Sequence, residues 1–364
     1  MNHIKLPKIA LFVLVMLFVV LLYIILKTLS FYLVPTTFAA LLAMLMLPMN
    51  RLLEKWRFPR ILAIITSLLV ILVIIGGIIT VVTTQVVSFA KDLPAIQDQL
   101  RIRIEELQSF IERLSGVTVE NQLTFIDQEL ATFLSSADKW ATGILLSTGG
   151  TLAAFGIMIL HFVLFLLYRD RIKGFFLGML KRGQHEQASI VIEEVTKVTR
   201  QYLTGVMIVM AIMSVLNSAG LLILGIQNAI FFGVLAAVLN IIPYIGVWIG
   251  AGLPILMAFL LKDSLLYPLG VLGIFLFNQF IDNNFLTPRI TGSQVKTNAL
   301  ATIGVILIGN MVWGVAGMIL FIPLLGIAKI IFDNVTDLKP FGYLIGEDES
   351  KPAVTPKKIV EDKE

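Results

Sequence analysis

The sequence predicts an all-α polytopic membrane protein with about eight spans, in which the C-terminal third holds broken or re-entrant helices. Three observations support this prediction. Of the 364 residues, 57% are hydrophobic and only 14% are charged, whereas a soluble domain carries about 25% charged residues. Apolar runs of roughly 20 residues recur along the chain, which is the length that crosses about 30 Å of hydrocarbon. In the last third, Pro, Gly and polar residues interrupt these runs.

Residues 1–87 are expected to hold the N-terminal transmembrane spans. An uninterrupted apolar run covers residues 9–26, and two further mainly apolar runs cover 31–48, with Pro35, and 61–87, with Gly76-Gly77. The connection between the second and third runs is basic, with one acidic residue among Arg51, Glu54, Lys55, Arg57 and Arg60. Cytoplasmic loops are enriched in Lys and Arg, so this connection and both chain termini are expected on the cytoplasmic side.

Residues 88–140 differ from the apolar runs that precede them, because they are more polar and their acidic residues outnumber the basic ones. Apolar residues recur at steps of three and four on both sides of Ser115-Gly116. This spacing predicts an extracytoplasmic helical hairpin with one apolar stripe. Two interpretations of the stripe stay open: its two arms pack on each other, or it lies at a subunit contact of a homo-oligomer.

Residues 141–202 are expected to form the fourth span and a basic cytoplasmic connection. The span covers about residues 144–168 and contains His161. An intramembrane histidine is either a proton relay or a neutral residue hydrogen-bonded to a neighbouring helix, and the second interpretation is the commoner one. After several basic residues, 184–202 reads as an interfacial helix, and a fifth span begins at Leu203.

Residues 203–332 are predicted to form a transport core with interrupted helices, followed by a disordered cytoplasmic tail at 333–364. One interruption is the stretch 240–246 and another is 278–289. A third is expected at Gly309-Asn310, because the apolar run 300–308 is too short to cross a bilayer. Interrupted helices in corresponding places indicate a binding site near the bilayer midplane.

The first two interruptions supply the candidate site residues. A Pro inside a helix removes a backbone hydrogen bond, and in hydrocarbon the freed carbonyl must face protein or an aqueous cavity. We therefore expect the breaks at Pro243 and Pro288 to present polar groups to a shared cavity. The predicted ion-coupling residues are Asp282 and Arg289. The predicted substrate-binding residues are Asn240, Pro243, Tyr244, Gly246, Gln279, Asn283, Asn284 and Pro288.

Structural interpretations of the same residues remain open at this point. Pro243 and Gly246 would also suit a simple helix kink, and the Asn residues would suit a helix cap at the headgroup level. Asp282 either binds a coupling cation or pairs with Arg289 or Lys296 as scaffold.

The sequence offers no sign of an enzyme, a cofactor or a nucleic-acid partner. It has no Cys, and its three His residues are scattered without paired-ligand spacing. No phosphate-binding loop, dinucleotide fingerprint or nucleophile elbow occurs, so no catalytic or metal-binding residue is predicted. The net charge of +4 comes from short basic connections, which membrane topology already explains.

The motifs of the C-terminal third resemble those of the autoinducer-2 exporter (AI-2E) family of bacterial inner-membrane proteins, over about residues 5–335. The resemblance implies an oligomeric secondary transporter with eight or so spans. Some members are linked to export of autoinducer-2 and others to exchange of sodium or lithium for protons. The chain departs from the family at Val206, Val247 and Asn298-Ala299, where Gln, Pro and His-Pro are frequent. The matching segments are Tyr168-Arg169-Asp170, Tyr202-Leu203-Thr204-Gly205, Asn240 to Gly246, Gln279 to Gly292 and Gly314 to Pro323.

Three functional hypotheses follow. The leading one is an ion-driven secondary transporter that exports a small metabolite or signal, similar to autoinducer-2. The alternative is a sodium (lithium)/proton antiporter, and a second alternative is an uncoupled channel or membrane scaffold. Antiport favours several buried carboxylates, and the core offers mainly Asp263 and Asp282. The lipid bilayer and a small molecule or ion are the expected partners.

Overall fold

The computed structural model describes residues 7–80, 83–84, 102, 148–242, 245–291 and 297–347, which are almost entirely helical. The extracytoplasmic hairpin predicted at 88–140 lies outside these residues, apart from residue 102. Six described helices are long and apolar enough to cross a bilayer, and two shorter apolar helices accompany them, which confirms a polytopic all-α membrane fold. The helices are α1 (Lys8–Thr28), α2 (Ser30–Lys55), the helix Arg60–Thr80, α5 (Thr148–Leu167), α6 (Arg169–Gly178), α7 (His185–Ile223), α8 (Ala229–Leu239), α9 (Ile245–Leu261), α10 (Leu266–Ile281), α11 (Thr287–Ile290), α12 (Ala299–Asn334) and α13 (Lys339–Ile345).

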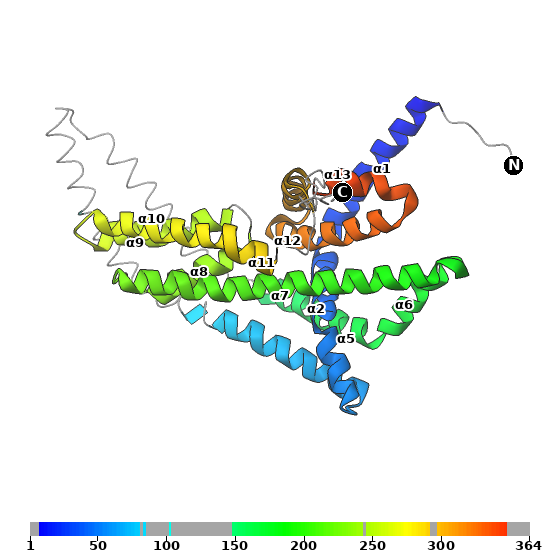
Figure 1. The fold of residues 1–364 in the computed structure, drawn as a ribbon, viewed down its shortest axis with the longest axis horizontal. Helices are drawn as coiled ribbons and strands as arrows, with labels where there is room; N and C mark the ends of the chain where they lie inside the picture. Colours follow the sequence, from blue (N-terminus) through cyan, green and yellow to red (C-terminus); the bar gives the residue numbers. More distant parts are fainter. Residues whose placement is uncertain are drawn as a thin grey trace, which may run out of the picture.

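Helix α7 is the element on which the others assemble. It has 39 residues, so it is about 58 Å long, and it runs across nearly the whole molecule (Figure 1). It packs against α2, α6, α8, α10, α11 and α12. The boundary predicted between an interfacial helix and a fifth span at 202/203 is wrong, because the change from polar to apolar residues there contains no helix breaker and α7 continues through it.

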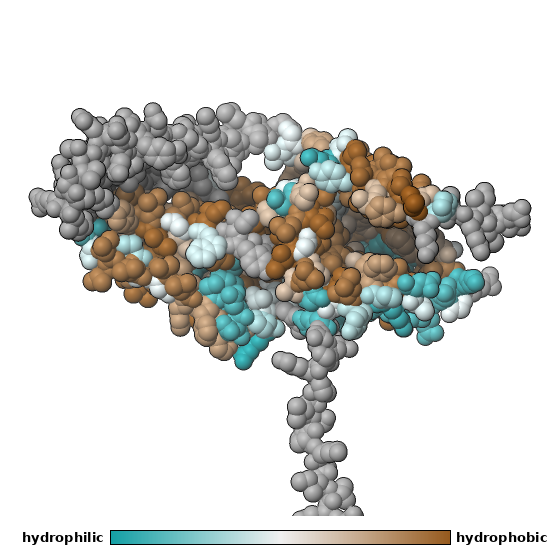
Figure 2. Space-filling view, turned by 90° about the horizontal axis from the view of Figure 1, so that it is seen from above, coloured by the Kyte–Doolittle hydropathy of each residue, from teal (hydrophilic) through white to brown (hydrophobic). Residues whose placement is uncertain are grey.

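The N-terminal helices form a separate packed group. Buried side chains of α2, the helix Arg60–Thr80 and α5 make one apolar cluster that includes Ala39, Ile64 and Phe162. Helices α1 and α2 meet at Leu29 (φ −89°, ψ 11°), a single non-helical residue that bends the chain. Helix α1 then extends away from the body (Figure 1), and its apolar side chains are exposed. Apolar residues also cover most of the face in Figure 2, with hydrophilic residues mainly along its lower edge.

Helices α8 and α9 form a hairpin at the first predicted interruption. They have 11 and 17 residues, or about 16 and 25 Å, so neither crosses about 30 Å of hydrocarbon comfortably. A Cβ on the buried Gly246 would collide with the Leu239 carbonyl oxygen, so only glycine permits this tight turn. A Cβ on Gly250 would lie 2.7 Å from the Ala236 Cα, which shows how closely the two arms pack. The predicted interruption is therefore present here, in the form of a helical hairpin.

The second predicted interruption is not a break. A π-helical turn at Asp282–Leu286 joins α10 to α11 without loss of helical backbone. The Thr287 N–H donates to the Asp282 carbonyl five residues back, and the wider π turn makes room for the ring of Pro288. The expectation that Pro288 frees a helix end is therefore wrong.

Helix α12 is a second hairpin, with its turn at Trp313-Gly314. Gly314 has φ 59° and ψ −140°, a conformation that only glycine adopts readily. A Cβ on Gly317 would collide with the Gly309 carbonyl oxygen, so the two arms lie backbone to backbone. An interruption in this segment is confirmed, but the turn predicted at Gly309-Asn310 is wrong, because Gly309 lies in the contact between the two arms instead.

The tail predicted to be disordered from residue 333 is folded as far as residue 347. Helix α13 packs against α12, and Asn298 holds the two together. The Asn298 Nδ2 donates to the carbonyls of Leu344 (2.8 Å) and Gly346 (3.0 Å), while its Oδ1 accepts from the Ala301 N–H (2.8 Å). These contacts join distant segments, so local composition could not reveal them. Residues 348–364 lie outside the described chain.

The arm contact of α12 gives a stability prediction. Replacing Gly317 with Ala forces two backbones apart, so we expect Gly317→Ala to destabilise the detergent-solubilised protein by about 1–3 kcal/mol or more. Gly304→Ala is the matched control, because a Cβ there meets nothing within 4 Å and alanine favours the helix. Thermal unfolding followed by intrinsic fluorescence would compare them, and equal midpoints would contradict the close contact.

Candidate functional site

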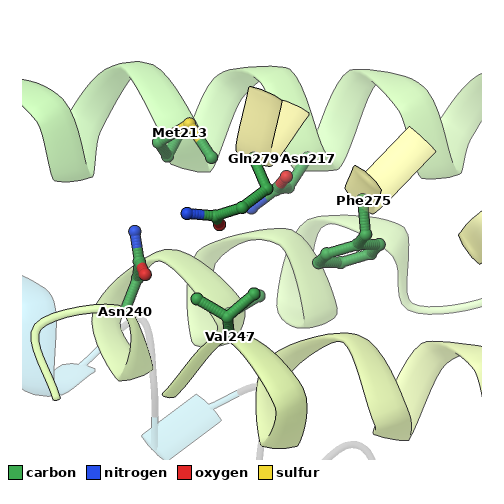
Figure 3. A pocket seen from close by; sticks show the side chains of 7 residues that line it. Met213, Asn217, Asn240, Val247, Phe275 and Gln279 are labelled. Atoms are coloured by element: carbon green, nitrogen blue, oxygen red, sulfur yellow. The ribbon is translucent and has the colours of Figure 1, made fainter. Parts of the chain in front are cut away.

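A small cavity lies where α7, α8, α9 and α10 meet. Each of three helices contributes two residues one turn apart, and α9 contributes Val247. The carboxamides of Asn240 and Gln279 point toward one another across this space (Figure 3). The cavity volume is about 10 Å³, which is about enough for one water molecule, so the site is closed in this conformation. The lining residues are Met213, Asn217, Ala236, Asn240, Val247, Phe275 and Gln279.

Asp282 lies beside this cavity and is only 4% exposed. Its Oδ2 accepts a hydrogen bond from the Asn240 Nδ2 at 3.1 Å, and its Oδ1 accepts from the Thr287 hydroxyl at 2.7 Å. Both donors are neutral. None of the ion pairs between described residues includes Asp282. A buried carboxylate is strongly stabilised by a cation, whereas this one has only neutral donors in the described chain.

The scaffold interpretation in which Asp282 pairs with Arg289 is not supported, because no ion pair joins the two among the described residues. Arg289 is exposed, and its guanidinium carbon lies 5.9 Å from the centre of the Phe285 ring. The two residues are seven positions apart along the chain, and the carboxylate oxygens of Asp282 accept from Asn240 and Thr287 instead. Arg289 therefore stays outside the site, and Lys296 lies outside the described residues.

The other predicted residues divide by helix face. Asn283, Asn284 and Pro288 are exposed. The Gln279 Nε2 donates to the Asn283 Oδ1 at 3.0 Å, and the Asn284 Nδ2 donates to the Phe280 carbonyl at 2.9 Å, so these asparagines make local helix contacts. Gly246 shapes the α8–α9 turn rather than the cavity wall. Pro243 and Tyr244 lie outside the described residues. The structure thus brings together Asn240, Gln279 and Asp282.

Sequence analysis missed a buried pair beside the cavity, Asn217 and Asn278. The Asn278 Nδ2 donates to the Asn217 Oδ1 at 2.9 Å, and the residues are 3% and 5% exposed. An Asn in the middle of the apolar run of α7 is a recognisable signal, because carboxamides inside membrane helices usually bond across to another helix. The partner helix could not be named without the fold.

Two further polar contacts connect the N-terminal helices. The His161 Nδ1 donates to the Ile157 carbonyl (2.8 Å), and its Nε2 accepts from the Tyr32 hydroxyl of α2 (2.8 Å). This agrees with the interpretation of His161 as a residue hydrogen-bonded to a neighbouring helix. Arg169 donates to the Asn50 Oδ1 (2.7 Å) and to Glu54. These residues hold α2 against α5 and α6. No group of three or more acidic, His or Cys side chains suited to a metal occurs among the described residues.

The comparisons with known proteins agree with this architecture. The model of the AI-2E family transporter matches residues 11–337, which is most of the chain. This protein belongs to the AI-2E family. Among AI-2E relatives, the chain is similar to the putative transport protein YueF of Bacillus subtilis, with 26% identity over 318 residues and 84% of each chain covered. It is also similar to the AI-2 transport protein TqsA of Escherichia coli, with 23% identity over 315 residues, covering 86% of this chain and 89% of that protein.

The contact between Asn240 and Asp282 gives a second prediction. Asn240→Ala removes one of the two donors to a buried carboxylate, so we expect it to lower the free energy of unfolding by about 1.5–3 kcal/mol. Asn284→Ala makes a similar change at an exposed position and is expected to stay within about 0.5 kcal/mol of wild type. Denaturant titration in mild detergent measures both. A larger loss for Asn284→Ala would contradict this assignment of helix faces.

Proposed function

We propose that this AI-2E family member is a secondary transporter that exports a small metabolite or signal, similar to autoinducer-2, and that an ion gradient drives it. The membrane fold and the relatives support transport in general, and the relative TqsA carries the name of an AI-2 transport protein. Coupling and substrate class rest on the cavity and on its carboxylate. The proposed solute contacts are Asn240 and Gln279, and Asp282 is the proposed ion-coupling residue.

The observation that carries this proposal is the bond between Asp282 and Asn240. Asn240 ends α8 at the turn of a short hairpin, while Asp282 lies in a π turn of the neighbouring helix. Binding of a proton or cation to Asp282 changes what its oxygens accept, and therefore changes its contact with Asn240. A cavity of about 10 Å³ excludes any metabolite, so transport requires the α8–α9 hairpin to move. Close glycine contacts between its arms favour motion of the hairpin as one unit.

The chemistry of the lining favours a metabolite over cation exchange. Its polar groups are three carboxamides, and Asp282 is the one acidic residue buried in the described core. An antiporter that exchanges sodium or lithium for protons is the alternative, because a carboxylate with neutral partners also suits a cation. An uncoupled channel or scaffold is the second alternative, and it requires that Asp282 be irrelevant to transport.

Replacement of Asp282 tests the proposal. We expect Asp282→Asn to fold and to transport autoinducer-2 without the pH dependence of wild type, because a carboxamide does not bind a proton. Proteoliposomes loaded with a pH-sensitive dye would report proton movement alongside autoinducer-2 flux. Asp263→Asn, the same chemical change between α9 and α10, is the matched control and should keep the pH dependence.

Each alternative has its own result in the same assay. Proton movement that follows sodium or lithium gradients without autoinducer-2 flux would establish the antiporter instead. Wild-type flux that is independent of pH and of every ion gradient would favour the uncoupled channel.

We also propose a bacterial inner-membrane location with both termini in the cytoplasm, and assembly as a homo-oligomer. The basic connection after α2 and the basic residues after α5 support this orientation, and the long exposed apolar face of α1 is compatible with subunit contact or lipid. Native mass spectrometry that finds only monomers would overturn the oligomer.

Cysteine labelling tests the orientation, because the chain has no native Cys. In intact cells, an impermeant thiol reagent is expected to label a cysteine that replaces Glu120 but not one that replaces Glu347. Rupture of the membrane should expose the second site. The opposite pattern would invert the proposed topology.

A further inference from the structure

The buried pair of Asn217 and Asn278 has a geometry that bears on the cavity. Asn217 belongs to the cavity lining, whereas Asn278 is not among the lining residues and lies against Asn217 from α10. A carboxamide offers two N–H donors and one carbonyl acceptor. Since the Asn278 Nδ2 donates to the Asn217 Oδ1 at 2.9 Å, the carbonyl of Asn217 is already used.

The side-chain Nδ2 of Asn217 is therefore the polar atom of this carboxamide that can donate a hydrogen bond into the cavity. No hydrogen bond of its Nδ2 occurs among the described residues, and this atom is not one of the fully buried unpaired nitrogens of the described chain. The two facts together place the Nδ2 of Asn217 at an opening rather than in packed side chains, and the opening that Asn217 lines is the cavity.

The cavity touches two polar layers along α10. Asn278 and Asp282 are four residues apart, so their layers are separated by about 6 Å, or one helical turn. Asn217 belongs to the first layer and Asn240 to the second. A solute in the cavity would therefore meet a neutral donor at one end and the Asn240–Asp282 contact at the other.

We propose that Asn217 contacts the transported solute and donates a hydrogen bond to one of its oxygen atoms, a carbonyl, hydroxyl or ether oxygen, and that Asn278 is a positioning residue that fixes the Asn217 carboxamide. This inference rests on the proposed function and extends it to a solute class. The described lining carries no cation, and Asp282 lies one turn away. The class is therefore uncharged, oxygen-bearing solutes rather than carboxylates or phosphates.

The test measures autoinducer-2 flux into proteoliposomes for the full chain and four variants. Asn217→Leu keeps a similar volume and removes the donor, so KM should rise about three- to tenfold with kcat within twofold. Asn278→Leu should raise KM in the same direction. Because Asn278 acts through Asn217, the double variant should have the KM of Asn217→Leu alone, whereas two independent structural roles would add. Asn310→Leu, at an exposed position of α12, is the matched control and should behave as wild type.

Thermal unfolding of each variant separates loss of contact from loss of fold, and Asn217→Ala, which also removes the donor, replaces Asn217→Leu if the latter unfolds. An unchanged KM for a folded Asn217 variant, with wild type active, overturns the inference and leaves the proposed function intact. If wild type does not move autoinducer-2, the proposed function fails and cysteine labelling decides the inference. A small neutral thiol reagent should then modify Asn217→Cys at least fivefold faster than Asn278→Cys, and equal rates would overturn it.

Discussion

The close approach of helix backbones to α7 is the constraint on which the rest of this structure depends. In hydrocarbon there is little hydrophobic force between helices, so they associate by tight packing and by hydrogen bonds between side chains. Small residues on α7 and its neighbours allow this packing. A Cβ on Gly205 would lie 2.6 Å from the Thr291 Cγ2, and one on Gly233 would collide with Ser218. Between α7 and α10, a Cβ on Gly220 would collide with the Ile274 Cγ2, and one turn away Asn217 and Asn278 bond directly.

The sequence predicted the architecture where a physical rule acts locally, and failed where a residue had more than one role. Long apolar runs located the spans, and Gly246 marked a true turn because its neighbouring backbone leaves no room for a Cβ. The sequence could not distinguish Gly309 from Gly314, since one glycine serves a backbone contact and the other a positive φ. The prediction of a helix break at Pro288 was wrong for a different reason. A π turn at Asp282–Leu286 precedes this proline and keeps the backbone helical, and the composition of this stretch does not indicate such a turn.

The candidate site was predictable in part for the same reason. Asn240, Gln279 and Asp282 were identified as candidate site residues because polar residues inside apolar runs are costly in a membrane and therefore indicate a functional site. Which face each residue occupies was not predictable: Asn283 and Asn284 adjoin Asp282 in sequence, but the helix turns them outward. Asn217 lies 61 residues from its partner, so only the fold could join them.

The distribution of charge separates scaffold from site. Arg169 of α6 pairs with Glu54 of α2, and Arg60 of the helix Arg60–Thr80 pairs with Asp170 of α6, so these ion pairs fix α6 against two N-terminal helices. The contacts of Asp282 differ from these ion pairs, because its two donors are a carboxamide and a hydroxyl. Either group can rotate so that it accepts a hydrogen bond instead of donating one. A buried carboxylate with only neutral partners has no fixed counter-ion. Under the proposed function, a bound proton or cation would supply that partner in one state and leave it in another, which a fixed Asp282–Arg289 pair would not allow.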